Sequence, residues 1–420
     1  MEDKRVGLWK SSGALIVLMV GSSVLYVLVY IRGTYYIPLM ETLQCNNTQL
    51  GVMGAAYGLA AMLCYFPGGW LADRVSARKL LTISFVSTGL GGLYFATFPS
   101  FLECVLLHAC WGIIISLTYW AAYVKAIRQM AAVTEQGRAF GFLEGGQGIV
   151  SGIILSLVLY LFIQLGSNKE ALAVVINIYS VLCILTGIIT WFVFKEKEDN
   201  ITSGDLWGDV IRVIKMPKVW MIALIIFCAY AAMSATQFLV PYSSGVFGAS
   251  VAFGAGLSIV KDYIRPFVAV GAGIAGDRIG SSKVIFFGYF LLFVGLISLV
   301  LVPGKGSMLP VLVINSVVIY LAMFMIRALY YALLEEGDIP VSISGAAVGF
   351  IATLGYIPEF LVPFIGGRLL DIFPGTEGFH CFFSIIALLV AVGFLATFYW
   401  MRITKEKRMA ILELKHPTKS

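Results

Sequence analysis

The sequence predicts an all-α membrane protein in which twelve transmembrane helices form two six-helix bundles related by a parallel repeat. The 420-residue chain is 60% hydrophobic and only 12% charged, and its mean hydropathy is +0.92. Twelve segments are apolar over about the 20 residues that a helix needs to cross the hydrocarbon core of a bilayer. A charged motif also occurs twice, 204 positions apart. These observations predict a repeated helical bundle.

The twelve predicted helices fill nearly the whole chain. Apolar residues continue around each helix instead of alternating at every second position, which favours bundled helices over a β-barrel. No small-residue cleavage site follows the first hydrophobic stretch, so we expect that helix to be retained. The approximate bounds are 12–40, 49–70, 80–97, 101–124, 138–162, 170–194, 218–240, 251–273, 283–302, 309–331, 345–367 and 378–402.

The basic residues lie mainly on one side of the predicted helices. Of 29 Lys and Arg, 22 fall in the ends and loops on one side and three on the other. The positive-inside rule places the basic side, with both termini, in the cytoplasm, and predicts a location in the cell inner membrane. The net charge of +6 therefore reflects topology, and we expect no nucleic-acid partner.

The sequence has no enzyme signature. A Walker motif, HExxH, GxSxG and a Rossmann fingerprint are all missing. The missing Walker motif also excludes a self-contained ATP-driven pump. Seven cysteines lie mostly in apolar runs without CxxC spacing, so neither a disulfide framework nor a metal site is expected. We expect no cofactor.

The longest polar interval, residues 194–220, separates six helices from six. Each half carries the same charged box, GGWLADRVSARK at 68–79 and AGIAGDRIGSSK at 272–283. A second similarity joins 137–149 to 345–357 in the same order. The predicted organisation is an N-terminal bundle (1–194), a cytoplasmic linker (195–217), a C-terminal bundle (218–402) and a cytoplasmic tail (403–420).

The first box resembles the signature between the second and third helices of the major facilitator superfamily. With the helix count and the repeat, the resemblance extends over essentially all 420 residues. It implies a secondary transporter whose two halves rock about a site at their interface. Ser76 stands where the family usually has glycine, whereas Gly280 keeps the glycine in the second copy.

The resemblance also implies a gating role for the box. In the family the acidic residue docks at the start of the eleventh helix, here near Gly345, and symmetry assigns its counterpart to the start of the fifth helix. A carboxylate is stabilised at a helix N-terminus. Loop charges that only fix topology are the alternative. The gating candidates are Asp73, Arg74, Arg78, Lys79, Asp277, Arg278 and Lys283.

Four basic residues lie inside predicted spans: Arg32, Lys261, Arg265 and Arg327. An ionisable group at that depth is costly and is a functional candidate by default. Snorkelling to the membrane surface is the alternative for Arg327. Asp262 either neutralises a neighbouring base or leaves a surplus positive charge that suits an anionic substrate. Pro266 is expected to break its helix locally.

Arg32 lies in the first helix, where Tyr30, Arg32 and Pro38 resemble the spacing in organophosphate:phosphate antiporters and the related anion–cation symporter branches. A guanidinium binds carboxylate or phosphate bidentately. The antiporters' second arginine, on the seventh helix, and their lysine, on the second, are missing here, so the sequence favours a small organic anion and leaves phosphate esters open. An outer-interface position is the alternative for Arg32.

Further side chains are candidates for the transport path. Buried acids and the mid-span histidine suit proton coupling, although for Glu144 the favoured alternative is an ion pair with Arg128 or Arg138. Aromatic and amide side chains suit hydrogen bonding to substrate, with packing as the alternative. The proton-coupling candidates are His108, Glu144, Asp262 and Glu359. The substrate-binding candidates are Arg32, Tyr35, Tyr36, Tyr57, Tyr119, Tyr230, Gln237, Lys261 and Arg265.

These observations predict a secondary active transporter that moves a sugar acid, carboxylate or similar small anion by alternating access. Proton symport is the favoured mode, and exchange of organophosphates or other anions is the alternative. A transporter-like nutrient sensor is the alternative of another class. The expected partners are the anionic small molecule, a proton or counter-substrate and the lipid bilayer, and we expect the monomer to function.

Overall fold

The computed structural model describes residues 12–130, 136–194, 206–340 and 343–415, and within these ranges the chain is helical with no strand. It divides into two compact units. Unit 1 comprises Met1–Thr202 with Ser250–Pro266, and unit 2 comprises Ser203–Ala249 with Phe267–Ser420. The division falls inside one helix, α12 (Val251–Ile279). Each unit is described by itself below.

The remaining helices of unit 1 are α1 (Ser12–Val29), η2 (Ile31–Gly33), α2 (Tyr36–Thr42), α3 (Asn47–Arg74), α4 (Ala77–Phe95), α5 (Phe101–Ile114), the π-helical η3 (Ile115–Tyr119), α6 (Trp120–Met130), α7 (Gln136–Gln164) and α8 (Lys169–Val193). Those of unit 2 are α9 (Leu206–Ile214), α10 (Pro217–Ala235), η5 (Thr236–Phe238), α11 (Leu239–Phe247), α13 (Ser281–Leu301), η6 (Gly306–Met308), α14 (Leu309–Leu329), η7 (Tyr330–Ala332), α15 (Leu333–Glu336), α16 (Ser344–Gly355), α17 (Pro358–Ile372), α18 (Thr376–Ile403) and α19 (Lys405–Lys415).

Each predicted membrane segment coincides with a helix or with consecutive helices of this set, which confirms the all-α prediction. Within the described ranges, eight helical stretches are long and apolar enough to cross a membrane, and Gly13–Val29 is a shorter apolar helix. α12 carries Lys261, Asp262, Arg265, Asp277 and Arg278, so its composition is more polar than that of the eight.

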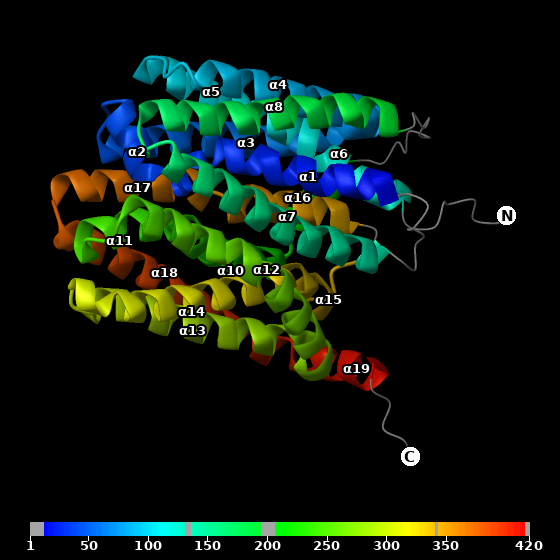
Figure 1. Ribbon diagram of the computed structural model, residues 1–420. Helices are drawn as coiled ribbons and strands as arrows, with labels where there is room; N and C mark the ends of the chain where they lie inside the picture. The colour runs from blue at the N-terminus through cyan, green and yellow to red at the C-terminus, as the bar shows by residue number, and fades with distance from the viewer. Residues whose placement is uncertain (1–11, 131–135, 195–205, 341–342, 416–420) are drawn as a thin grey trace. The chain divides into compact units, whose positions relative to one another are not determined.

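The two units repeat the same helix contacts. In unit 1, α8 packs against α4 and α1, and α7 packs against α1. In unit 2 the equivalent contacts are those of α18 with α13 and α10, and of α16 with α10. Figure 1 shows the helices of each unit lying side by side along a common direction. The recurrence of the same contacts supports the parallel repeat predicted from the charged boxes.

The first helix of each half is interrupted at an equivalent place. In unit 1 the 3₁₀ turn η2, Ile31–Gly33, separates α1 from α2, and in unit 2 the 3₁₀ turn η5, Thr236–Phe238, separates α10 from α11. The two turns lie 205 positions apart in the sequence. A 3₁₀ segment inside a helix often marks a functional site. Arg32 and Gln237 are the middle residues of these turns.

One local prediction was wrong, and one helix was not predicted. Pro266 does not break its helix, because α12 continues through it from Val251 to Ile279. The proline ring packs against α7. Its Cβ is 3.4 Å from the position that a Cβ added to Gly145 would take, and its Cδ is 3.0 Å from that of a Cβ added to Gly148. Membrane helices tolerate proline where neighbouring helices pack against it. The linker also contains a helix, α9, that the sequence analysis did not predict.

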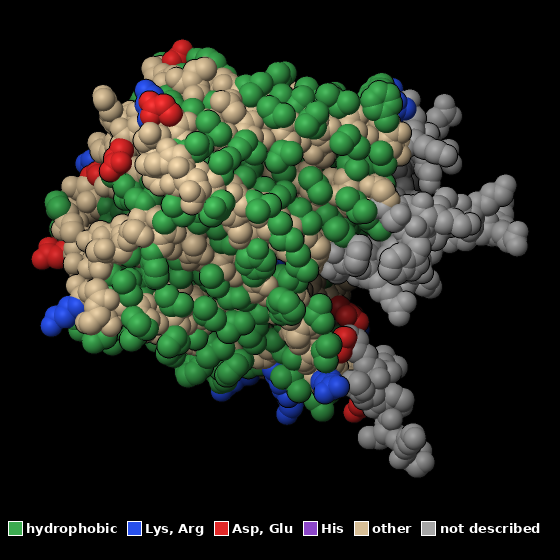
Figure 2. Space-filling model, viewed as in Figure 1, with side chains coloured by type: hydrophobic (Ala, Val, Ile, Leu, Met, Phe, Trp, Pro, Cys, Tyr) green, Lys and Arg blue, Asp and Glu red, His purple; other side chains and the backbone are tan. Residues whose placement is uncertain are grey.

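Large apolar side chains are exposed along the helices. Phe192, Phe267 and Leu301 are each more than 70% exposed (79, 74 and 73%), whereas the side chains of Tyr35, Phe85 and Trp400 are fully buried. In Figure 2 hydrophobic side chains cover most of the visible face. An apolar exterior of this extent needs an apolar solvent, so these faces lie against lipid.

Candidate functional site

Arg32 is the most deeply buried of the in-span basic residues in unit 1. It lies in η2, its side chain is 5% exposed, and its guanidinium carbon is 5.9 Å from the centre of the Tyr30 ring. The phenols of Tyr36 and Tyr57 interact electrostatically with the guanidinium. The structure therefore brings Arg32 together with two of the predicted tyrosines and places it inside the bundle, not at an outer interface.

Aromatic rings continue from Arg32 across unit 1. Tyr57 and Tyr30 meet edge to face at 5.3 Å, Tyr30 stacks on Tyr26 at 6.2 Å, and Tyr26 meets Tyr119 at 5.6 Å. Tyr119 in turn stacks on Tyr123 at 5.5 Å. Tyr119 is the last residue of the π-helical η3, and π segments are frequent at functional sites. The rings form a continuous path between α3, α1 and α6.

Glu144 and Arg265 form an ion pair between α7 and the part of α12 that belongs to unit 1. Their side chains are 35% and 12% exposed, and Arg265 also lies 3.4 Å from the amide oxygen of Gln147. Glu144 thus pairs with Arg265, whereas the side chains of Arg128 and Arg138, its alternative partners, lie outside the described residues. Because a partly buried pair neutralises both charges, Arg265 is not a surplus positive charge in this state.

Glycines bring α7 and α12 together beside this pair. A Cβ on Gly148 would stand 2.8 Å from the Asp262 carbonyl oxygen, and a Cβ on Gly152 would stand 2.8 Å from the Tyr263 ring. The hydroxyls of Ser156 and Tyr263 are 3.2 Å apart. Asp262 and Lys261 are half-buried on the same turn of α12. The helices approach so closely that a larger residue on α7 would separate the ion pair.

The charged box of unit 1 is held by contacts within its own unit. Arg74 donates to the Trp70 carbonyl oxygen at 3.1 Å, and Arg78 stacks on Trp191 at 4.1 Å. Lys125 donates to the carbonyl oxygens of Ala72 and Val75, at 2.6 and 3.2 Å. Lys125 therefore caps the carboxyl end of α3, where carbonyl groups lack helical partners. Lys79 is exposed, and the Asp73 side chain lies outside the described residues.

The box of unit 2 has a different turn. Ser76 caps α4 with φ −62°, and its hydroxyl accepts from the Lys79 amide, whereas Gly280 precedes α13 with φ +97°. Asp277, Arg278 and Lys283 are exposed. The glycine and serine at matching positions therefore give different geometries, since only glycine adopts φ near +97° without strain.

Two residues that the sequence analysis missed hold this second turn. Glu336 is 4% exposed and accepts from the Ser282 amide at 3.0 Å and from the Trp400 indole at 3.3 Å. Arg408, on α19, is 6% exposed and donates to the Ser282 hydroxyl at 3.1 Å. Arg408 was counted only among the basic residues of the cytoplasmic side, and Glu336 was not singled out, because nothing in the local sequence shows that α15 and α19 fold back onto α13.

Other predicted residues lie in packed surroundings. The His108 ring is 2% exposed, its Nδ1 is 2.8 Å from the Cys104 carbonyl oxygen, and it packs at 5.1 Å against Trp111. Tyr35 is fully buried against Phe162 at 5.0 Å. Both side chains are thus packed among other residues of unit 1, and His108 also interacts electrostatically with Arg32.

Unit 2 has its own tyrosine cluster. The rings of Tyr230 and Tyr356 pack with their centres 4.1 Å apart. The Tyr356 hydroxyl is 2.9 Å from the Tyr331 hydroxyl. Arg327 contacts the Met233 sulfur at 3.1 Å and is half-buried, so it does not reach out as a free snorkelling side chain. Glu359 lies in the first turn of α17, directly after Pro358. Gln237 is half-buried in η5.

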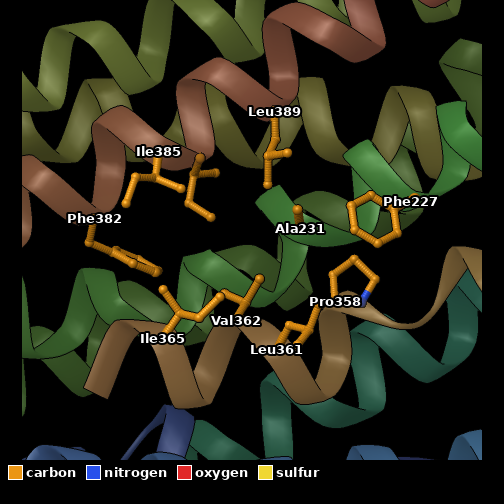
Figure 3. A pocket seen from close by; sticks show the side chains of 10 residues that line it. Phe227, Ala231, Pro358, Leu361, Val362, Ile365, Phe382, Ile385 and Leu389 are labelled. Carbon is orange, nitrogen blue, oxygen red and sulfur yellow. The ribbon is translucent and has the colours of Figure 1, made fainter. Parts of the chain in front are cut away.

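A cavity of about 50 Å³ lies between α10, α17 and α18 in unit 2. Figure 3 shows apolar side chains from all three helices around it, among them Phe227, Val362 and Phe382. Its lining has no polar side chain to orient a charged substrate. The cavity is therefore not a candidate for an anion site.

The model of the Major Facilitator Superfamily matches residues 13–357, more than three quarters of the chain. The chain belongs to this superfamily. Its repeated helix contacts, paired interruptions and repeated charged boxes are thus features of a superfamily transporter, and the resemblance drawn from the box is confirmed.

Three relatives in the superfamily align over most of the chain. The chain is 25% identical to the inner membrane protein YihN of Escherichia coli K12 over 399 residues, covering 92% of the chain and 94% of YihN. It is 27% identical to the inner membrane protein YqcE of the same organism, covering 87% and 89%. It is 23% identical to the probable nitrate/nitrite antiporter NarK1 of Thermus thermophilus, covering 89% and 86%.

Solved structures share the fold of this superfamily member. A bacterial homologue of the human lysosomal transporter Spinster has a TM-score of 0.75 at 14% identity, covering 95% of the chain and 98% of that structure. A variant of the nucleoside transporter NupG has a TM-score of 0.76 at 14% identity, covering 92% and 99%. At this identity the similarity shows the fold alone.

Proposed function

We propose that the protein is a secondary active transporter that carries a small organic anion, such as a sugar acid or another carboxylate, by alternating access. The observation that carries the proposal is the guanidinium of Arg32, buried inside unit 1 on a 3₁₀ turn and surrounded by tyrosines. An ionisable group at that depth costs about 2.5–3.5 kcal/mol on insertion scales, which favours a functional role. A guanidinium among phenols binds a carboxylate bidentately and offers rings for the carbon skeleton.

The charges around Arg265 favour coupling to protons. Glu144 and Arg265 are paired and partly exposed, so protonation of Glu144 would release Arg265 from its partner. Of the four proton-coupling candidates, Glu144 is the one whose charge state directly changes a contact between α7 and α12. We therefore propose symport with protons, with Glu144 as the carrier.

Exchange is the second candidate mode, because the relative NarK1 is named a probable nitrate/nitrite antiporter. The relatives YihN and YqcE are named inner membrane proteins, and we propose the same location here with both termini cytoplasmic. We also propose that the two halves, residues 1–194 and 218–402, move against each other, with Asp73 and Asp277 as latches.

Uptake by proteoliposomes tests the proposal. Labelled D-gluconate, L-lactate and glycerol 3-phosphate are offered with an inward proton gradient, or with each compound preloaded inside and no gradient. Gradient-driven uptake supports symport, and uptake only after preloading supports exchange. Glu144→Gln should lose gradient-driven uptake and keep exchange between preloaded vesicles. Equal gradient-driven uptake by this variant would remove Glu144 as the carrier.

Arg32→Ala is the decisive variant. Loss of a charge-assisted hydrogen bond is worth about 1.5–3 kcal/mol, so kcat/KM should fall about 10- to 150-fold. Arg368→Ala, which removes an exposed arginine from α17, is the matched control and should transport normally. Normal uptake by folded Arg32→Ala would refute the proposed binding site.

A further inference from the structure

We infer that Gly54 is a positioning residue for Arg32, so that α3 supplies a notch that seats the guanidinium. The inference rests on the proposed function, because it explains how the proposed anion-binding group is oriented. Gly54 lies on α3, in its second turn, and is buried. It was not among the residues that the sequence analysis singled out.

The geometry of the notch is specific. A Cβ built on Gly54 would stand 1.6 Å from Nη1, 2.2 Å from Cζ and 2.6 Å from Nη2 of Arg32. All three atoms belong to the guanidinium, so the group lies directly against the α3 backbone, in the volume that any side chain at position 54 would occupy. Its carbon lies 5.9 Å from the Tyr30 ring centre. The guanidinium is thus located between α3 and that ring.

The closest atoms in the clash belong to the end of one long side chain. The three nearest atoms to the added Cβ are all from Arg32, and none is backbone. We therefore expect a methyl group at position 54 to move the guanidinium and to leave the helices in place. By contrast, a Cβ on Gly112 would stand 2.4 Å from the Tyr57 carbonyl oxygen, so that glycine is needed for the packing of α5 against α3. The missing side chain of Gly54 thus makes room for another side chain, and that of Gly112 makes room for the backbone of a neighbouring helix.

Seating the guanidinium has a consequence for binding. An arginine side chain that is free in solution loses several rotamers when it binds a ligand, and a preorganised one has already lost them. Bidentate recognition also requires the planar group to hold one orientation. The notch restricts the rotamers of Arg32 and fixes the orientation of its guanidinium. This explains why a residue without a side chain stands at this position of a transmembrane helix.

Gly54→Ala tests the inference, with Gly271→Ala as the control. Gly271 is an exposed glycine of α12, outside both charged boxes, and a Cβ added to it would have no atom within 4 Å. We expect Gly54→Ala to keep the apparent melting temperature and to raise the KM for D-gluconate, L-lactate or glycerol 3-phosphate, whichever the wild type transports, by about tenfold or more. Gly271→Ala should match the wild type. An unchanged KM in Gly54→Ala would overturn the inference.

A double-mutant cycle separates positioning from packing. In Arg32→Ala the guanidinium is gone and the notch is empty, so adding Gly54→Ala should cost nothing further. Additive losses in the double variant would overturn the inference. If Gly54→Ala alone fails to fold, recovery of folding in the double variant supports the notch, and failure of both variants assigns Gly54 to helix packing and overturns it.

The failure of this inference is distinguishable from failure of the proposed function. Normal transport by Arg32→Ala removes the anion site itself. Impaired transport by Arg32→Ala together with normal transport by Gly54→Ala keeps the site and removes only the notch.

Discussion

The two units interrupt their first helices at equivalent places but put different chemistry there. In unit 1 the middle residue of the 3₁₀ turn is Arg32, buried against α3, and in unit 2 it is Gln237, half-buried and neutral. The backbone interruption is repeated, whereas the charge is not. The two interruptions therefore share a backbone geometry and differ in the charge that they carry.

The same contrast holds for the charged boxes. Both begin a helix at the same point of the repeat, yet Ser76 turns with φ −62° and Gly280 with φ +97°. In unit 1 the neighbouring lysine, Lys125, caps the preceding helix. In unit 2 the C-terminal helix α19 covers the turn through Arg408. Motif residues that match in the sequence therefore have different structural roles in the two halves.

Among the changes that test this comparison, Gly280→Ala is expected to have the largest effect on stability. Alanine at φ +97° is strained, and its Cβ would stand 2.7 Å from the buried Arg408 Cδ. The cost should be about 1–3 kcal/mol, which lowers the apparent melting temperature by about 2–10 °C. The readout is the melting curve of the purified protein in detergent.

Ser76→Gly is the reciprocal change and serves as the control. It removes a side-chain cap, and Ser-to-Gly at such a position costs only a few tenths of a kcal/mol. A melting temperature lowered as much by Ser76→Gly as by Gly280→Ala would show that the two turns are equivalent after all.

A smaller effect is expected at Gln237. If the neutral interruption hydrogen-bonds the uncharged part of the substrate, Gln237→Ala should lower kcat/KM about 2- to 12-fold, because a neutral hydrogen bond contributes about 0.5–1.5 kcal/mol. Gln237→Glu places a negative charge near an anionic substrate and should lower it further. Uptake of the transported probe in proteoliposomes measures both variants. A loss in Gln237→Ala as large as that in Arg32→Ala would show that the neutral and the charged interruption contribute equally to transport.

The fold could be predicted from the sequence because its signals are local or repeated. Long apolar runs determine the helices, and the boxes around Asp73 and Asp277 show the repeat without any tertiary contact. The contacts of the site could not be predicted, because they join residues far apart in the chain. Glu144 and Arg265 are 121 positions apart, and the local alternative, pairing with Arg128 or Arg138, followed from proximity in sequence.

Glycines were the least predictable part of the site. The sequence contains 44 of them, and nothing local separates Gly54, where an added Cβ would clash with a guanidinium, from Gly271, where an added Cβ would have no atom within 4 Å. The signal is tertiary, because it depends on which side chain lies against α3. The surroundings of His108 were equally unpredictable, since a lone histidine in a span suggests proton transfer and only tertiary contacts show that its ring packs against Phe95 and Trp111.

The smallest effect is expected at the exposed contact of α19. Lys407 donates to Asp338, and this lowers the pKa of the Asp338 carboxyl below its ordinary value. A lowered pKa in the folded state means that the contact stabilises above the carboxyl's ordinary range and is lost as pH falls through the folded-state value. Both groups are largely exposed, so salt screens the pair and its contribution is small.

Lys407→Met should therefore lower the melting temperature slightly at neutral pH, and the difference from wild type should vanish in acid or in high salt. Lys405→Met, which removes an exposed lysine from the same helix, should show no such pH dependence. Arg408 follows Lys407 directly but is buried against Ser282. Because that neighbour holds α19 at Ser282, loss of the Lys407 contact should leave the helix docked, and release of α19 in Lys407→Met would show that the exposed pair, not the buried arginine, fixes the tail.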